Sequence, residues 1–99
     1  MCAIHGISWR SETNIKKMIS LSHHRGPDDN HYMIFDKISL GHNLLSIMDE
    51  AKYSKQPICT DQITLVFNGE IYNYNDLKTK YSLDVNSNCD TEVLVKVLQ

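Results

Sequence analysis

The sequence predicts a small domain of mixed α and β structure, in the α+β class, and two patterns carry this prediction. Short apolar segments, such as residues 2–8 and the ITLVF segment at residues 63–67, are typical of buried strands. Elsewhere, apolar residues recur three or four positions apart, as on one face of a helix. The 99 residues allow one domain at most. A chain of this length buries only about 60% of its unfolded surface, so its core is small.

The first half of the chain predicts a strand, a helix and a hairpin. After the strand at residues 2–8, Thr13 or Asn14 is the predicted N-cap of a helix. The apolar residues of this helix are Ile15, Met18, Ile19 and Leu21. Residues 25–29 have the composition of a turn. Residues 31–35 and 38–43 then predict the two strands of a hairpin that turns at Asp36-Lys37.

The second half predicts a loop, a strand and two helices. Residues 48–61 are polar and contain a proline, so they predict a loop before the ITLVF strand. Asn73 or Asn75 is the predicted cap of a helix over residues 74–81. Asp90 or Thr91 is the predicted cap of a final helix. The apolar residues of that helix are Val93, Leu94, Val97 and Leu98.

Composition excludes several classes of function. The formal net charge is −2, which gives no general electrostatic case for binding nucleic acid or an anionic membrane. No apolar stretch approaches the roughly 18 residues of a membrane span, and no signal peptide is evident. We therefore expect a cytoplasmic protein. Three cysteines, Cys2, Cys59 and Cys89, cannot all pair within one chain, and their spacing is not a disulfide framework.

Cys2 is a candidate nucleophile. If Met1 is removed, Cys2 carries both a thiol and a free α-amine. An α-amine titrates near pH 8 and can act as a base, while the deprotonated thiol is a strong nucleophile. Position alone leaves the alternative that a cysteine occurs here by chance.

Asn68-Gly69 is a second candidate, because it follows the ITLVF strand at a sharp turn. A side-chain amide and a backbone N–H at such a turn can both point at one oxygen, which is the arrangement of an oxyanion hole. Glycine allows the backbone to approach closely. Taken alone, the pair is better explained as an ordinary Asn-Gly turn.

Metal and nucleotide sites are not predicted. The histidines and cysteines lack the spacing of a structural zinc site, and the four glycines are isolated rather than gathered in a phosphate loop.

Seven short motifs occur in an order that resembles one known family. They are Cys2-Ala3-Ile4, His24-Arg25-Gly26-Pro27-Asp28, Leu40-Gly41-His42, Leu45-Ser46-Ile47, Gln56-Pro57, Phe67-Asn68-Gly69-Glu70-Ile71-Tyr72-Asn73 and Asp90-Thr91-Glu92-Val93. Together they resemble the N-terminal glutaminase domain of asparagine synthetases, which are class II glutamine amidotransferases. The resemblance spans nearly the whole chain. It favours the asparagine-synthetase branch, because relatives that aminate sugar phosphates usually vary the residues after His-Arg-Gly.

The resemblance implies the αββα sandwich of the N-terminal-nucleophile (Ntn) hydrolases, of which residues 1–99 would be the N-terminal part, incomplete at the C-terminus. It implies hydrolysis of L-glutamine to glutamate and ammonia, which would supply asparagine synthesis. In family terms Cys2 would be the nucleophile that forms a γ-glutamyl thioester, and Asn68 and Gly69 would hold the oxyanion. Asp90 would bind the substrate α-ammonium group. The remaining substrate-binding positions would be Glu70, Ser46 and Ile47.

The resemblance also implies partners. No cofactor is expected in this chain, because ATP and Mg would bind only to a synthetase domain, whose Ser-Gly-Gly-x-Asp-Ser motif is absent from these 99 residues. The expected partners are L-glutamine and a C-terminal synthetase domain or a separate synthetase chain. The resemblance is also compatible with a homodimer.

Two positions depart from the family pattern. Ala3 stands where the family has glycine, which is a small change. Leu44 stands where the family has the arginine that binds the glutamine α-carboxylate. Leucine offers neither a charge nor a hydrogen-bond donor. Losing such an ion pair costs on the order of several kcal/mol of binding free energy. Lys52 and Lys55, just downstream, are candidate replacements.

These departures leave two alternatives to a working glutaminase. One is a truncated or diverged glutaminase-like remnant without turnover, or a regulatory module. The other is a metal-binding or interaction module built on His23, His24 and Cys59, which has almost no support from spacing.

Overall fold

A three-stranded antiparallel sheet forms the first half of the structure, a computed structural model that describes residues 2–45, 55–85 and 89–99. Its strands are β1 (Ala3–Ile7), β2 (Asp29–Ile34) and β3 (Ser39–Leu44), with β3 in the centre. The hairpin between β2 and β3 closes where Phe35 N donates to Ile38 O at 2.8 Å. The first strand and the hairpin predicted from the sequence are therefore confirmed.

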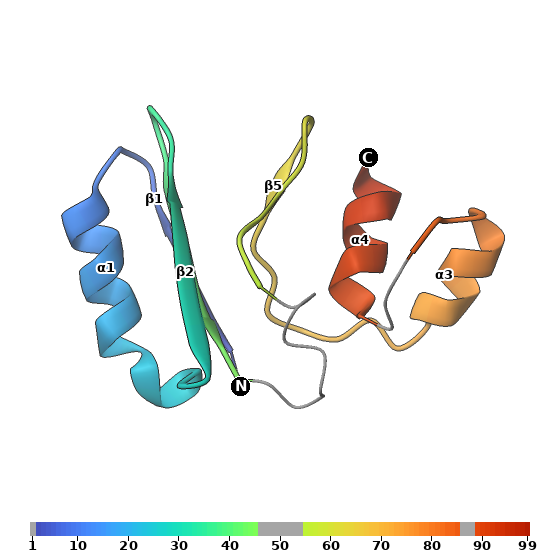
Figure 1. The fold of residues 1–99 in the computed structure, drawn as a ribbon, viewed down its shortest axis with the longest axis horizontal. Coiled ribbons are helices and arrows are strands. Elements are labelled where there is room, and N and C mark those ends of the chain that lie inside the picture. Colours follow the sequence, from blue (N-terminus) through green and yellow to red (C-terminus); the bar gives the residue numbers. More distant parts are fainter. Residues whose placement is uncertain (1, 46–54, 86–88) are drawn as a thin grey trace.

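Helix α1 (Glu12–Leu21) covers one face of this sheet (Figure 1). Ile15 and Ile19 from the helix and Ile7 from β1 form the buried core, against which partly buried hydrophobic residues pack. Those residues are Met18, Tyr32 and Ile34. A Cβ atom on Gly41 would lie 3.0 Å from Ile19 Cδ1, so glycine lets the helix pack close to the central strand.

The cap predicted for this helix is wrong. Ser11, with an extended backbone, is the N-cap, and its Oγ accepts a hydrogen bond from Asn14 N at 3.2 Å. The helix therefore begins earlier than Thr13 or Asn14 would allow. Leu21, which was expected on the apolar face, is 71% exposed in the last turn.

A second, smaller sheet pairs β4 (Ile58–Cys59) with β5 (Thr64–Leu65) in antiparallel fashion. Two predictions are confirmed only in part here. Part of the predicted loop at residues 48–61 forms β4, while residues 48–54 of that loop lie outside the described residues. The ITLVF strand is also shorter than predicted, because Phe67 N donates to the side chain of Gln56 instead of a neighbouring strand.

Two helices follow: α3 (Tyr74–Lys80) and α4 (Asp90–Leu98), which contact each other. Asn73 is the N-cap of α3, as one of the two predictions had it, although no side chain caps the helix by a hydrogen bond. Cys89, rather than Asp90 or Thr91, is the N-cap of α4. No helix within the described ranges is long and apolar enough to cross a membrane.

The buried face of α4 also differs from the prediction. Thr91, Val93 and Val95 are buried, whereas Val97 and Leu98 are 40% and 55% exposed. The buried residues of α4 therefore lie in its first two turns. The preceding residue, Cys89, is also buried.

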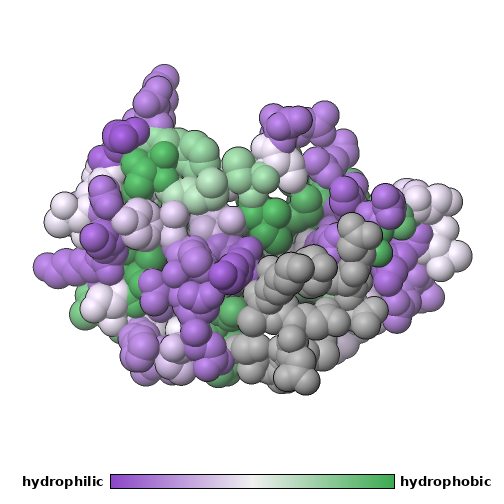
Figure 2. All heavy atoms as spheres, in the orientation of Figure 1, coloured by the Kyte–Doolittle hydropathy of each residue, from purple (hydrophilic) through white to green (hydrophobic). Residues whose placement is uncertain are grey.

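The elements are stacked in layers, in the order α1, the three-stranded sheet, the two-stranded sheet, and then α4 with α3 (Figure 1). Hydrophobic residues continue across the visible surface from the first sheet toward the second (Figure 2). In β3 the side chains alternate between the two faces. Gly41 faces α1, so Leu40, His42 and Leu44 face away from it, toward the second sheet. A mixed α and β fold with small antiparallel sheets is thus confirmed, and it is compatible with the N-terminal part of an Ntn-hydrolase sandwich.

Candidate functional site

Cys2 directly precedes β1 and lies at the end of the three-stranded sheet. Its Sγ accepts a hydrogen bond from Leu45 N at 3.4 Å and lies 3.8 Å from Leu45 O. Leu45 directly follows the central strand β3. The thiol is only partly buried, so a reagent or substrate can reach it.

Arg25 contacts the backbone of Cys2. It ends a short 3-10 helix, η1 (His23–Arg25), and its Nη2 donates to Cys2 O at 3.3 Å. Gly26 explains how the chain reaches this place. A Cβ atom at Gly26 would lie 2.5 Å from the backbone carbonyl carbon of Asn43, so only glycine lets the segment run directly against β3. The sequence predicted a turn here but assigned Arg25 no role.

Asn68 also reaches Cys2. Its Nδ2 donates to Cys2 O at 3.0 Å, although the two residues are 66 positions apart in the sequence. A carboxamide has two N–H donors, so Asn68 can donate a second hydrogen bond to a ligand beside the thiol. Two of the predicted catalytic residues, Cys2 and Asn68, therefore lie together.

Gly69 and Glu70 extend this segment. Both are exposed, and they lie on irregular backbone between β5 and α3 rather than in a hairpin turn. A Cβ atom on Gly69 would lie 3.1 Å from the ring of Phe67, so the absence of a side chain allows the backbone to fold closely over that ring.

Asp90, the first residue of α4, ties the helix to the same segment. Its Oδ2 accepts a hydrogen bond from Ile71 N at 2.8 Å, two residues beyond Gly69. The carboxylate is only partly buried, so a ligand can reach it. Ser46 and Ile47, the other two predicted substrate-binding residues, lie outside the described residues.

Gln56 and His42 were not singled out as site residues from the sequence. Gln56 is 5% exposed, and its Oε1 accepts the backbone N–H of Phe67 at 2.5 Å. His42, on β3, is 1% exposed. Burial lowers the pKa of His42 to about 4, and a hydrogen bond with the Phe67 backbone opposes that shift. The only available signal for Gln56 was the Gln56-Pro57 motif.

Lys55 lies near the strand end that carries Leu44. Its Nζ is 3.9 Å from Asp29 Oδ2, and Asp29 is directly opposite Leu44 in the β2–β3 register. Partial burial alone would raise the pKa of Asp29. Hydrogen bonds from His31 and from its neighbour's backbone N–H, with the charge of Lys55, lower it instead. Lys55 thus lies near the residue that pairs with Leu44, and Lys52 lies outside the described residues.

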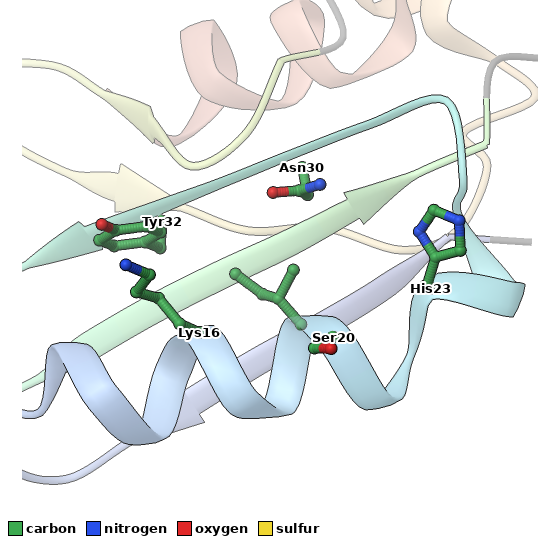
Figure 3. A pocket seen from close by; sticks show the side chains of 6 residues that line it. Lys16, Ser20, His23, Asn30 and Tyr32 are labelled. Carbon is green, nitrogen blue, oxygen red and sulfur yellow. The ribbon is translucent and has the colours of Figure 1, made fainter.

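A hollow of about 290 Å³ lies elsewhere, between α1 and β2. Lys16, Tyr32 and Asn30 are spread along it, with His23 at its far end (Figure 3). It is on the α1 side of the sheet and contains no cysteine, so it is separate from the Cys2 site. Within the described ranges, no three His, Cys, Asp or Glu residues are grouped to hold a metal ion.

The comparisons with known proteins show the family of this chain. The glutamine amidotransferase domain family matches residues 1–99. This chain belongs to the glutamine amidotransferase domain family. It is 36% identical, over 98% of its length, to putative asparagine synthetase [glutamine-hydrolyzing] 2 of Methanocaldococcus jannaschii. It is 37% identical, over 85% of its length, to asparagine synthetase [glutamine-hydrolyzing] 1 of Bacillus subtilis. It is 34% identical, over its whole length, to asparagine synthetase B [glutamine-hydrolyzing] of Escherichia coli.

This glutamine amidotransferase domain covers only a small part of those relatives. It spans 24%, 14% and 20% of their respective lengths. Membership in the family is therefore shown over the whole chain, which spans less than a quarter of each of these relatives.

Proposed function

We propose that this domain hydrolyses L-glutamine to glutamate and ammonia, with Cys2 as the nucleophile. The observation that carries the proposal is the hydrogen bond from Asn68 Nδ2 to Cys2 O at 3.0 Å. It brings a thiol and a side-chain amide donor together from opposite parts of the chain. Amide hydrolysis needs both a nucleophile and a donor for the oxyanion.

In the first step, the Cys2 sulfur attacks the side-chain carbonyl carbon of glutamine. The α-amine of Cys2, freed by removal of Met1, accepts the thiol proton and passes it to the departing nitrogen. The carbon–nitrogen bond breaks, ammonia leaves, and a γ-glutamyl thioester remains on the sulfur. Water then attacks the thioester, which gives glutamate and restores the thiol.

Asn68 and Gly69 stabilise the negative oxygen of both tetrahedral intermediates. The second N–H of Asn68 and the backbone N–H of Gly69 are the donors. Loss of one such donor typically costs about 100- to 1000-fold in kcat. Asp90 binds the α-ammonium group, since a carboxylate close to the same backbone segment suits that charge.

The ammonia released would be used by a synthetase domain or a separate synthetase chain to make asparagine. Support for this partner comes from the three relatives, whose names include asparagine synthesis and glutamine hydrolysis. No step of the glutaminase reaction itself calls for a cofactor.

The test is glutaminase activity of the 99-residue chain, after mass spectrometry has shown that Met1 is removed. We expect Cys2→Ala to lower glutamate release by more than about a thousandfold, because no other group can form the thioester. Cys59→Ala is the matched control, since Cys59 is an exposed thiol in β4. Activity that persists in Cys2→Ala rejects the nucleophile.

A non-catalytic glutaminase-like domain is the second candidate, and Leu44 is the observation that favours it. Leu44 is 5% exposed on the face of β3 that points away from α1, and it cannot bind a carboxylate. Calorimetric titration with L-glutamine separates the two candidates. Binding that weakens about threefold or more in Lys55→Ala, but not in Lys37→Ala, assigns the α-carboxylate to Lys55. Absence of glutamine binding favours the non-catalytic domain.

A further inference from the structure

The backbone of Phe67 is held from one side by a buried side chain. Phe67 N donates to Gln56 Oε1 at 2.5 Å, and Gln56 is 5% exposed. This bond takes the place of a strand pairing, because β5 already ends at Leu65. Leaving a backbone N–H without a buried partner costs free energy of folding. This hydrogen bond therefore fixes the position of the Phe67 backbone.

The three-stranded sheet places a buried side chain near the same residue. His42, on the central strand β3, is 1% exposed, and the nearby Phe67 backbone opposes the lowering of its pKa. Its Nε2 has no partner in the described part of the chain. Burial keeps this imidazole neutral at ordinary pH, and a neutral imidazole carries a single N–H donor.

The residues just after Phe67 are those that reach Cys2. Asn68 donates to Cys2 O at 3.0 Å, and the close packing of Gly69 on the Phe67 ring leaves no room for a Cβ atom without adjustment. A displacement of Phe67 would therefore move both oxyanion donors. Donors of this kind must lie within about 0.5 Å of their productive position.

We propose that Gln56 is the positioning residue that holds Asn68 and Gly69 in place for glutamine hydrolysis. The inference rests on the proposed function. The Gln56 side chain acts through the Phe67 backbone rather than on the substrate. The oxyanion donors matter more in the transition state than in substrate binding, so disorder of this segment lowers kcat more than it changes KM.

The decisive variant is Gln56→Met, which keeps the side-chain length but removes the acceptor. We expect amide hydrogen exchange at residues 67–69 to accelerate by on the order of tenfold, since Phe67 N–H loses its partner. In the same variant kcat should fall about 10- to 100-fold with KM changed less than about threefold. Gln56→Glu, which keeps an acceptor at the same atom, should retain more activity than Gln56→Met.

Ser39→Ala is the matched control. Ser39 is fully buried, and its Oγ accepts from Ser11 N and donates to Trp9 O, both at 2.9 Å. The variant loses a similar buried bond on the α1 side of the sheet, so it should lower stability while leaving kcat and the exchange at residues 67–69 unchanged.

The outcomes separate the two proposals. Unchanged exchange at residues 67–69 in Gln56→Met overturns the inference, and so does faster exchange with an unchanged kcat. A kcat loss in Ser39→Ala equal to that in Gln56→Met also overturns it, because general destabilisation would then explain both. A wild-type chain that binds glutamine but releases no glutamate rejects the proposed function itself and the inference with it, whatever the exchange shows.

Discussion

The two halves of this domain are stabilised in different ways. In the first half, α1 and the strands β1, β3 and β2 form full ladders of five and six paired residues around the core of Ile7, Ile15 and Ile19. In the second half, β4 and β5 pair only two residues each. There, single bonds from side chains to the backbone, such as those of Gln56 and Asp90, connect the segments.

This difference matters because the candidate site takes residues from both halves. Cys2 and Arg25 lie in the first half: Cys2 directly precedes the paired strand β1, and Arg25 at the end of η1 donates to its backbone. Asn68, Gly69 and Asp90 lie on the second half, where a few bonds set their positions. We infer that substitutions in the first half mainly affect folding, whereas those in the second can affect substrate turnover without large losses of stability.

The largest effect is expected from Gly26→Ala in the first half. A Cβ atom there would lie 2.5 Å from Asn43 C and 2.7 Å from Leu44 N, and backbone atoms of a central strand cannot move aside cheaply. We expect a loss of about 4 kcal/mol in the free energy of unfolding, measured by urea denaturation.

Gly6→Ala is the matched control for that change. A Cβ atom on Gly6 would meet only Leu40 Cδ2, at an ordinary contact distance of 3.7 Å. Its free energy of unfolding should stay within about 1 kcal/mol of the wild type. Equal effects of the two substitutions would contradict the close approach of the segment after Arg25 to β3.

The second-largest effect is a pH dependence of stability that comes from His42. This residue lies on the face of the three-stranded sheet that points toward the two-stranded sheet. Burial lowers its pKa from 6.5 to about 4, with His5 and His31 adding smaller contributions in the same direction. The unfolded chain therefore binds an extra proton between these two values, so stability falls as the pH decreases from 6.5 to 4. The shift corresponds to at most about 3 kcal/mol.

Unfolding measurements across that pH range check this prediction. His42→Gln should flatten the pH dependence, because its side chain does not titrate. His24→Gln is the control, since His24 is exposed on η1 and should leave the slope unchanged. A slope that is the same in all three proteins would mean that folding leaves the pKa of His42 unchanged.

The sequence predicted the elements that depend on local patterns. The spacing of Ile15 and Ile19 predicted α1, and the hairpin followed from two apolar segments around Asp36-Lys37. Its motifs also predicted that Cys2 and Asn68 belong to one site, although only the fold shows how their atoms meet. Roles that depend on contacts between distant residues were missed. Arg25 reaches Cys2 across 23 positions, and no local pattern encodes such a contact.

The same reason explains the failures in the second half. The ITLVF segment has strong strand propensity, but the side chain of Gln56 captures the Phe67 N–H and ends the strand early. Asp90 has the propensity of an N-cap, yet its carboxylate accepts from Ile71 N instead of from a backbone N–H of its own helix. In both cases a tertiary hydrogen bond overrides a local preference.

The smallest effect is expected from Asp90, where charge and hydrogen bonding can be separated. Asp90→Asn keeps an oxygen that can accept from Ile71 N, so stability should change by less than about 0.5 kcal/mol. The variant loses the negative charge for the glutamine α-ammonium group. A hydrogen bond to a charged group contributes about 1.5–3 kcal/mol, so KM for glutamine should rise about 10- to 100-fold.

Asp90→Ala removes both contributions and should additionally cost about 1–2 kcal/mol of stability, since Ile71 N–H is left without its partner. Asp76→Asn, an exposed carboxylate in the first turn of α3, is the control and should change neither quantity. If Asp90→Asn keeps the KM of the wild type while Asp90→Ala loses both stability and turnover, Asp90 acts only by tying α4 to the segment after Gly69. The comparison of the two halves would then extend to substrate binding. Asp90 would then supply only the shape of the site, and the anion that binds the α-ammonium group would have to come from another residue.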